Sequence, residues 1–246
     1  LFPYTPVFRS TNGQWLLNGT SPNTAGAPGL VSSFLTWESI NTANIGVDFA
    51  LMSNRLTGSF EVFTRKTLDM VADAPTLPAT LGTWVPQSNN TDLKTTGFEA
   101  TIGYNDRTAG GFGYGAKFLL SDYQTTVTRF NNEAGQLTRY RTGQKMGEIW
   151  GYETIGIAKT QEEMDAHLAT LPNGGQSRLG QQWGAGDIMY KDLNGDGVID
   201  WGDDTEGNPG DKRGIGNNTP RYSFGLNLNA DYKNFDLSLF FQGVGK

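Results

Sequence analysis

The chain has 246 residues and a formal net charge of −6, so it can bury a sizeable core as one or two domains and lacks the clustered positive charge that nucleic-acid binding needs. Its 33 glycines and 29 aromatic residues (14 Phe, 9 Tyr and 6 Trp), with only 37% hydrophobic residues, are typical of an all-β protein with long irregular loops. It has no cysteine, which excludes disulfides, and no apolar run of about 18 residues, which excludes a transmembrane helix. A signal peptide is not expected in this sequence. A transmembrane barrel is still compatible, because barrel strands alternate apolar and polar residues.

The first predicted hairpin follows a loop. Residues 1–38 are rich in proline, asparagine and glycine and are expected to form no regular element. Apolar residues then occupy every second position over 43–51, which predicts a strand with one apolar face. A tight turn at Ser53 and Asn54 leads into a second alternating stretch over 56–62.

Two further hairpins show the same alternation. A loop of about 28 residues, 67–94, is expected to separate the first hairpin from the second. The third hairpin has a short turn at Lys233 and Asn234. The expected strand pairs are 98–104 with 112–120, and 222–232 with 235–241.

Residues 122–220 are predicted to be one long loop insert without a sustained strand pattern, although 125–130 could extend the preceding strand. Within it, Thr160 and Glu163 have the spacing of a capping box and predict a short helix to about Ala169. The sole histidine, His167, lies on this helix, where a solvated position is expected; a histidine-based triad or multi-histidine zinc site is therefore not expected.

The second half of the insert resembles a calcium loop. Counted from Asp192, oxygen-bearing side chains fall at positions one, three, five, nine and twelve, and Gly197 stands at six, where an EF-hand loop turns sharply. Position twelve is an Asp, as in dockerin-type loops, and Asp204 beside it could substitute. Flanking helices are not evident, so a structural ion in another fold is expected. The predicted ligands are Asp192, Asn194, Asp196, the carbonyl of Val198, Asp200 and Asp203. The alternative is a solvated turn without an ion.

Aromatic residues in the expected loops are candidates for ligand binding, because their rings could stack on sugars or pack on a partner. These residues are Trp84, Trp150, Tyr152, Trp183 and Trp201, with Tyr190 nearby in sequence. The alternative is that they form small hydrophobic cores within the loops. The glycine-rich run 110–115 lacks the lysine and helix of a phosphate loop, and no enzyme activity is expected.

All three hairpins combine a short turn at one end with a very long loop at the other. Outer-membrane barrels have this asymmetry, with short periplasmic turns and long extracellular loops. Aromatic residues beside the short turns, such as Tyr104, Phe112, Tyr232 and Phe235, suit a membrane-interface girdle. About six strands cannot close such a barrel, so a section of a larger wall is predicted.

Several strings along nearly the whole chain support this interpretation. They are 35–38 (LTWE), 44–49 (NIGVDF), 54–59 (NRLTGS), 147–152 (GEIWGY), 186–197 (GDIMYKDLNGDG), 219–222 (TPRY) and 240–244 (FFQGV). In these strings and their order, the sequence resembles the SusC/RagA family of TonB-dependent outer-membrane importers.

The resemblance implies that residues 1–246 form part of a 22-strand transmembrane barrel in the Gram-negative outer membrane, taken from its C-terminal half. It implies contact with membrane lipid, a SusD-like lipoprotein partner, a glycan or peptide substrate, and energy from the TonB complex through N-terminal parts that this sequence does not contain. The competing interpretation is a secreted, calcium-stabilised glycan-binding or adhesive β-domain, which does not account for the one-sided loops.

Overall fold

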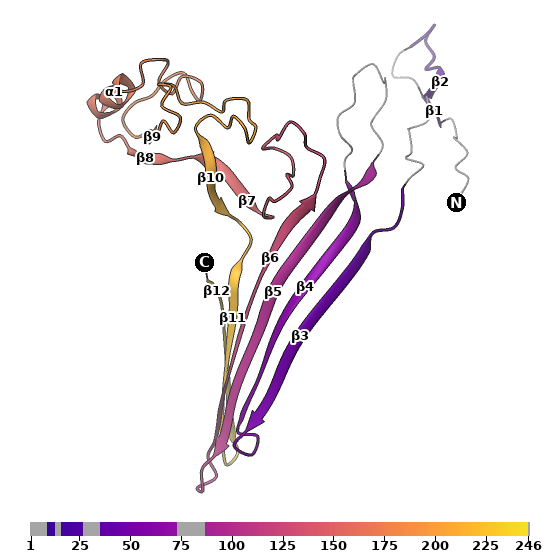
Figure 1. The fold of residues 1–246 in the computed structure, drawn as a ribbon, viewed down its shortest axis with the longest axis vertical. Coiled ribbons are helices and arrows are strands. Elements are labelled where there is room, and N and C mark those ends of the chain that lie inside the picture. Colours follow the sequence, from indigo (N-terminus) through magenta and orange to yellow (C-terminus); the bar gives the residue numbers. More distant parts are fainter. Residues whose placement is uncertain (1–8, 13–15, 27–34, 73–86, 246) are drawn as a thin grey trace.

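The computed structural model describes residues 9–12, 16–26, 35–72 and 87–245 (Figure 1). Its main feature is a six-stranded antiparallel sheet in the order β12-β11-β6-β5-β4-β3. The all-β, antiparallel fold class is therefore confirmed, whereas a total of 22 strands stays a prediction. The six strands are β3 (Ser39–Leu51), β4 (Leu56–Ala72), β5 (Ser88–Arg107), β6 (Gly113–Arg129), β11 (Arg221–Tyr232) and β12 (Phe235–Gly245).

The three predicted hairpins are present, but the strands of the first two are longer than expected. The loop prediction for 67–94 was wrong at both ends, because β4 continues to Ala72 and β5 already begins at Ser88. The β5 part of this extension is polar, and the β4 part is interrupted at Asp69, which has a φ of 58° and lies at a register shift. Neither part therefore shows the regular apolar alternation by which strands are predicted. Similarly, β6 runs to Arg129 and occupies the first residues of the predicted insert.

Short turns lie at one end of the sheet and the insert between β6 and β11 at the other, as Figure 1 shows. Met52, Ser53 and Asn54 have φ angles of 54°, 57° and 67°, and Lys233 has 54°; these left-handed conformations let the chain reverse in a few residues. The predicted asymmetry of the hairpins is therefore a property of the fold.

The sheet has one apolar and one polar face. Val47, Phe60, Ala100, Leu120 and Phe224 lie directly opposite one another in successive strands and so point to the same side. Side chains on this apolar face are open to the surroundings; Ile45 is 73% exposed and Val47 65%. The register places a polar row on the opposite face, formed by Glu61, Glu99, Ser121 and Ser223.

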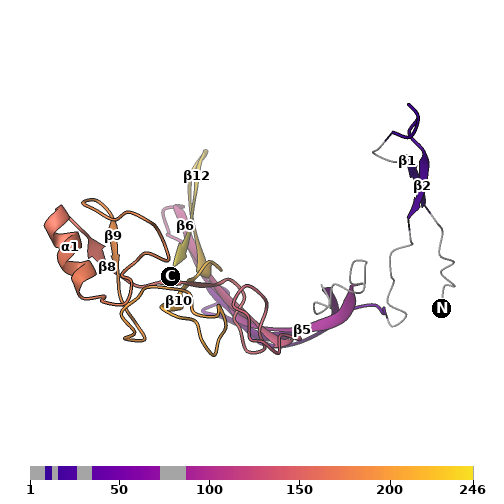
Figure 2. The same ribbon diagram turned by 90° about the horizontal axis from the view of Figure 1, so that it is seen from above.

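The insert folds into small elements beyond the end of the sheet (Figures 1 and 2). β7 (Glu148–Tyr152) pairs with β10 (Lys212–Asn217), and β8 (Thr154–Ile157) pairs with β9 (Ile188–Tyr190). Near the N-terminus, β1 (Arg9–Asn12) pairs with β2 (Asn23–Gly26), so the expectation of a loop throughout residues 1–38 was wrong. These strands have too few residues to show a clear alternation.

The predicted helix is α1 (Gln161–Ala169). The Thr160 hydroxyl accepts a hydrogen bond from the Glu163 N–H (3.2 Å), and Glu163 accepts one from the Lys159 N–H (2.7 Å), which satisfies two free donors at the helix start. The single histidine is half-buried rather than solvated as expected, because its Nε2 lies 3.2 Å from the buried Gln176 side chain.

A small hydrophobic core stabilises the insert. Ala158, Met164 and Met189 are buried, and Leu168 and Trp183 pack against them. Within the ranges that the structure describes, no helix is long and apolar enough to span a membrane.

Candidate functional site

Residues 192–211, here called the acidic loop, contain the predicted calcium ligands. Gly195 and Gly197 have φ angles of +76° and +81°, which favour glycine and bend the chain tightly. The Asp192 carboxylate lies inside this bend, where Oδ1 accepts from the Gly195 N–H (2.6 Å) and Oδ2 from the Gly197 N–H (2.9 Å). A Cβ on residue 197 would also come within 3.0 Å of Pro172, so glycine is needed there for close packing.

The next predicted ligands repeat this arrangement. Asn194 Oδ1 accepts from the Asp196 N–H (3.1 Å), and Asp196 Oδ1 accepts from the Val198 N–H (3.0 Å). Asp200 Oδ1 accepts from the Gly202 N–H (2.8 Å). Side-chain oxygens at alternate positions are thus held by backbone donors of the same loop.

The hydrogen bonding at position twelve differs from that at the preceding positions. Asp203 is exposed, and its carboxylate accepts a hydrogen bond from the Asn208 side chain (2.9 Å). Instead, the fully buried Asp211 reaches into the loop; its Oδ1 accepts from the Leu193 N–H (2.7 Å) and its Oδ2 from the Asp200 N–H (2.9 Å). Sequence spacing did not identify this residue, because nineteen positions separate it from Asp192.

The electrostatics of Asp211 suit a cation. Burial raises its pKa, and the negative charges of Asp192 and Asp196 raise it further, although its two backbone donors act in the opposite direction. Among the described residues, no Lys or Arg forms a salt bridge with Asp192, Asp196, Asp200 or Asp211. These four carboxylates therefore concentrate negative charge, whereas Asp204 of the same loop pairs with Lys212 at 2.7 Å.

The acidic loop is anchored to the turn after α1. The Asn173 N–H donates to the Gly197 carbonyl (3.0 Å), and the Asn173 side chain donates to the Asp196 carbonyl. The Ile199 N–H donates to the Gly175 carbonyl (2.8 Å), and the Ile199 side chain is buried. These contacts hold the loop in place from outside the cluster of oxygens.

In the described part of the chain, no three His, Cys, Asp or Glu side chains form a ready-made metal cluster. The loop carboxylates face backbone N–H groups instead. The donors that calcium prefers are present all the same, since every candidate group is a carboxylate, amide or carbonyl oxygen.

The candidate ligand-binding aromatics fall into different environments. Trp84 lies outside the described residues. Trp150 donates its Nε1–H to Glu148, and the Arg141 guanidinium lies 5.2 Å from its ring centroid. Trp201 is 44% exposed and lies within the acidic loop.

Three aromatic rings of the insert form a chain. The Tyr152 and Tyr190 ring centroids are 5.5 Å apart, and Trp183 meets Tyr190 edge-on at 6.2 Å. The Trp183 Nε1–H donates to the Gln176 carbonyl (3.1 Å). Burial, with the charges of Asp200 and Asp211 nearby, raises the pKa of Tyr152 to about 12. These contacts are those of a small loop core, and binding of a ligand by these rings stays a prediction.

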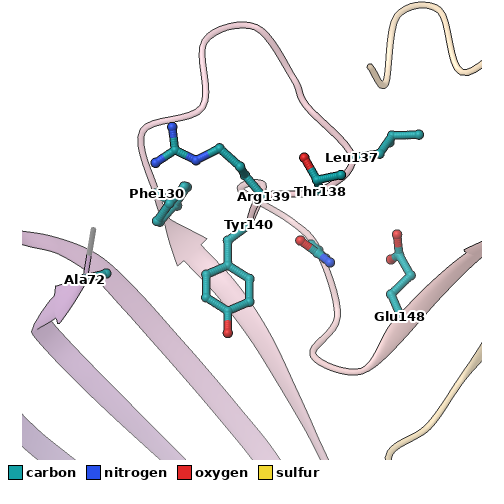
Figure 3. A pocket seen from close by; sticks show the side chains of 8 residues that line it. Ala72, Phe130, Leu137, Thr138, Arg139, Tyr140 and Glu148 are labelled. Atoms are coloured by element: carbon teal, nitrogen blue, oxygen red, sulfur yellow. The ribbon is translucent and has the colours of Figure 1, made fainter. Parts of the chain in front are cut away.

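A pocket that the sequence did not indicate opens at the loop end of β6 (Figure 3). It has a volume of about 470 Å³. Phe130 and Tyr140 meet edge-on at 5.6 Å, and the Arg139 guanidinium lies 5.4 Å from the Phe130 ring centroid. The lining residues are Ala72, Phe130, Leu137, Thr138, Arg139, Tyr140, Gln144 and Glu148.

Comparison with known proteins shows which proteins the chain is similar to. No protein-family model matches the chain. The sequence is 28% identical over 221 residues to TonB-dependent receptor P3 of Formosa agariphila, which covers 85% of this chain and 20% of the receptor. It is 23% identical over 248 residues to TonB-dependent receptor SusC of Bacteroides thetaiotaomicron, covering 96% of the chain and 22% of SusC.

Solved structures show the same fold. The RagAB peptide importer in its open-open state matches 99% of this chain and 24% of the importer chain, with a TM-score of 0.66 and 17% identity. The chain thus spans about a fifth of the length of the curated relatives that it matches. The resemblance indicated by the sequence is therefore confirmed: this chain is similar in sequence to TonB-dependent receptors, SusC among them, and similar in fold to part of the RagAB importer.

Proposed function

We propose that this chain forms part of the barrel wall of a TonB-dependent importer in the outer membrane of a Gram-negative bacterium. The observation that carries the proposal is the continuous, exposed apolar face across all six strands. An antiparallel sheet with one solvated face normally packs its apolar side on a core. Here lipid would cover that side, and the polar face would line the lumen.

The proposed orientation follows from the ends of the sheet. The short turns face the periplasm and the insert with its acidic loop faces outward, as is usual for outer-membrane barrels. Near the short turns, Phe112 lies 6.4 Å from Tyr232 and 6.0 Å from Tyr114. Such a group of rings suits the membrane interface, where an apolar body and a polar edge are both accommodated.

We further propose that the acidic loop binds calcium. The all-oxygen donor set, the fully buried Asp211 and the absence, among the described residues, of a salt bridge to Asp192, Asp196, Asp200 or Asp211 support this proposal. Asp192, Asn194, Asp196, Asp200 and the Val198 carbonyl would be ligands, with Asp211 taking the place first assigned to Asp203. A bound ion would offset the repulsion within the loop and shape the entrance of the barrel.

The partners are inferred from the similarity. A SusD-like lipoprotein would meet the outer loops, and the TonB complex would act on parts of the receptor beyond this chain. The substrate class would be a glycan or a peptide, for which the pocket beside Phe130 and Tyr140 supplies aromatic and cationic contacts. No enzyme activity is proposed, because the relatives are named as receptors and importers.

The alternative of a secreted calcium-stabilised binding domain has one specific support, the acidic loop. It leaves the apolar face of the sheet unexplained, since a soluble domain rarely exposes an apolar surface of this extent. The importer is therefore the better account of the whole fold.

Labelling of single cysteines tests the proposed orientation, because the chain has no cysteine of its own. In a cysteine-free background of the full-length receptor, Lys159→Cys in the insert should react with a membrane-impermeant maleimide on intact cells. Lys233→Cys in a short turn should react only after the outer membrane is permeabilised. Equal labelling of both positions on intact cells would refute the membrane placement.

A further inference from the structure

Three lysines form a row across the sheet, between its apolar rows and the end that carries the insert. The register places Lys66 directly opposite Lys94, and Lys94 directly opposite Thr126. The chain returns beside β6 after the 130–144 connection, and an antiparallel bridge sets Lys145 directly opposite Thr126. Directly opposed residues of antiparallel strands point to the same face. Lys66, Lys94 and Lys145 are therefore on one side of the sheet, and each is exposed.

This side is the apolar one. Along β4, residues 62, 64 and 66 alternate without a register shift, so Lys66 shares its face with Val62. Along β5 the same holds for Lys94 and Phe98. One row of side chains lies between the lysines and the last apolar row, so the two are four residues apart, or about 13 Å along the strands. Strand tilt in a barrel shortens the vertical distance to roughly 10 Å.

The lysines lack carboxylate partners within the described ranges, although acidic groups lie nearby. On the side toward the loops, Arg129 pairs with Asp92 and Asp69, both at 2.7 Å. On the side toward the apolar rows, Asp122 is bound by Arg221 through two hydrogen bonds. The acids next to the row are thus already held by arginines.

Like charges directly opposite one another destabilise a sheet unless something neutralises them. The side chains between the lysines and the apolar rows are Thr64, Thr96 and Gln124, which can donate hydrogen bonds to an oxygen-rich group. Lysine stems can also lie along the sheet toward the apolar side and keep the ammonium group at the polar boundary. From the insert end of the sheet toward the short turns, this face therefore presents positive charges, then side chains that donate hydrogen bonds, and then apolar side chains.

We propose that Lys66, Lys94 and Lys145 bind the phosphate groups of anionic membrane lipids whose acyl chains cover the apolar face. The proposal rests on the membrane placement given above. It identifies the lysine row as the outer boundary of the hydrocarbon region and as a site for lipids with phosphate headgroups. It also explains why three positive charges gather on a chain whose net charge is −6.

The test uses the full-length receptor in neutral detergent. Equal amounts of phosphatidylglycerol and phosphatidylcholine are added, and bound lipids are counted by native mass spectrometry for the wild type and for the triple variant Lys66→Gln, Lys94→Gln, Lys145→Gln. Each basic residue near an anionic surface contributes about fivefold in binding, so the triple variant should lose the phosphatidylglycerol preference by about a hundredfold.

Matched controls separate this site from a general charge effect. Lys117→Gln, Lys159→Gln, Lys191→Gln changes the charge equally, but at an inward-facing strand position and in the insert, and should keep the preference. Replacement of the three row lysines by arginine should also keep it. Inorganic phosphate at the same concentration should compete poorly, because it has no acyl chains.

A wild type that binds both lipids equally, or a lysine-row variant that keeps its preference, would overturn the proposal while leaving the membrane placement intact. Strong competition by inorganic phosphate would also overturn it and indicate a simple anion site. A wild type that stays soluble without detergent and takes up neither lipid would refute the membrane placement itself.

Discussion

Replacing Asp211 provides the most direct test of how the acidic loop is built. In Asp211→Ala, the Leu193 and Asp200 N–H groups both lose a carboxylate acceptor. A hydrogen bond to a charged group contributes about 1.5–3 kcal/mol, so the two bonds set an upper range of about 3–6 kcal/mol for local stability. Removal of the carboxylate also removes the cost of burying its charge and, secondarily, the repulsion with Asp192 and Asp196, so we expect the low end, about 3 kcal/mol.

Hydrogen exchange measures this loss at the amides concerned. In the full-length receptor, about 3 kcal/mol corresponds to roughly a hundredfold faster exchange of the Leu193 and Asp200 amides. Calcium affinity, measured by titration calorimetry, should fall in parallel, because a buried ligand of the proposed site is lost. The matched control is Asp203→Ala, which removes one hydrogen bond from an exposed carboxylate and should change both quantities little.

The two variants distinguish the geometry of the structure from the spacing in the sequence. If Asp203→Ala weakens calcium binding more than Asp211→Ala does, the assignment of Asp211 to the site is refuted. If neither variant nor the wild type binds calcium, the acidic loop is a hydrogen-bonded turn without an ion.

Three further predictions concern the loop and the sheet. The pKa of Asp211 is raised in the folded protein, so the part of the stability that is linked to its protonation is present at low pH and is lost as the pH rises through that pKa. Protection factors of the calcium-free loop, corrected for intrinsic exchange, should therefore decrease as the pH is raised from acid, while the hydrogen bonds of the ionised carboxylate remain. Asp196→Ala should loosen residues 183–211 and reduce substrate uptake without unfolding the barrel, and unchanged protease sensitivity of the loop would contradict this. Gly97→Ala would place a Cβ 2.6 Å from both the Phe63 ring in β4 and the Asp122 carbonyl in β6, so it should lower the free energy of unfolding in urea by about 1–3 kcal/mol. The control Gly110→Ala, whose Cβ would have only one atom within 4 Å, should not.

The amino-acid sequence by itself determined the hairpins of the sheet. Alternation of apolar and polar residues over 43–51 or 222–232 reports a local geometry, since successive side chains of a strand point to opposite faces. The helix at Gln161 was equally predictable, because the bonds of the Thr160 and Glu163 side chains reach only to neighbours in the chain. The turn that contains Asp192, Asn194 and Asp196 was also predictable from local sequence, because their side chains accept hydrogen bonds from backbone amides only two to five residues away.

The tertiary structure decided what depends on residues far apart. Asp211 meets the Leu193 and Asp200 N–H groups only because the chain returns to them after the turn at 202–210. Lys145 meets Thr126 only because the 130–144 connection folds back beside β6. The extensions of β4 and β5 form strands by pairing with each other, although neither has a regular apolar alternation of its own. Local sequence encodes the period of an element, but contacts between distant segments arise only when the whole sheet sets their register.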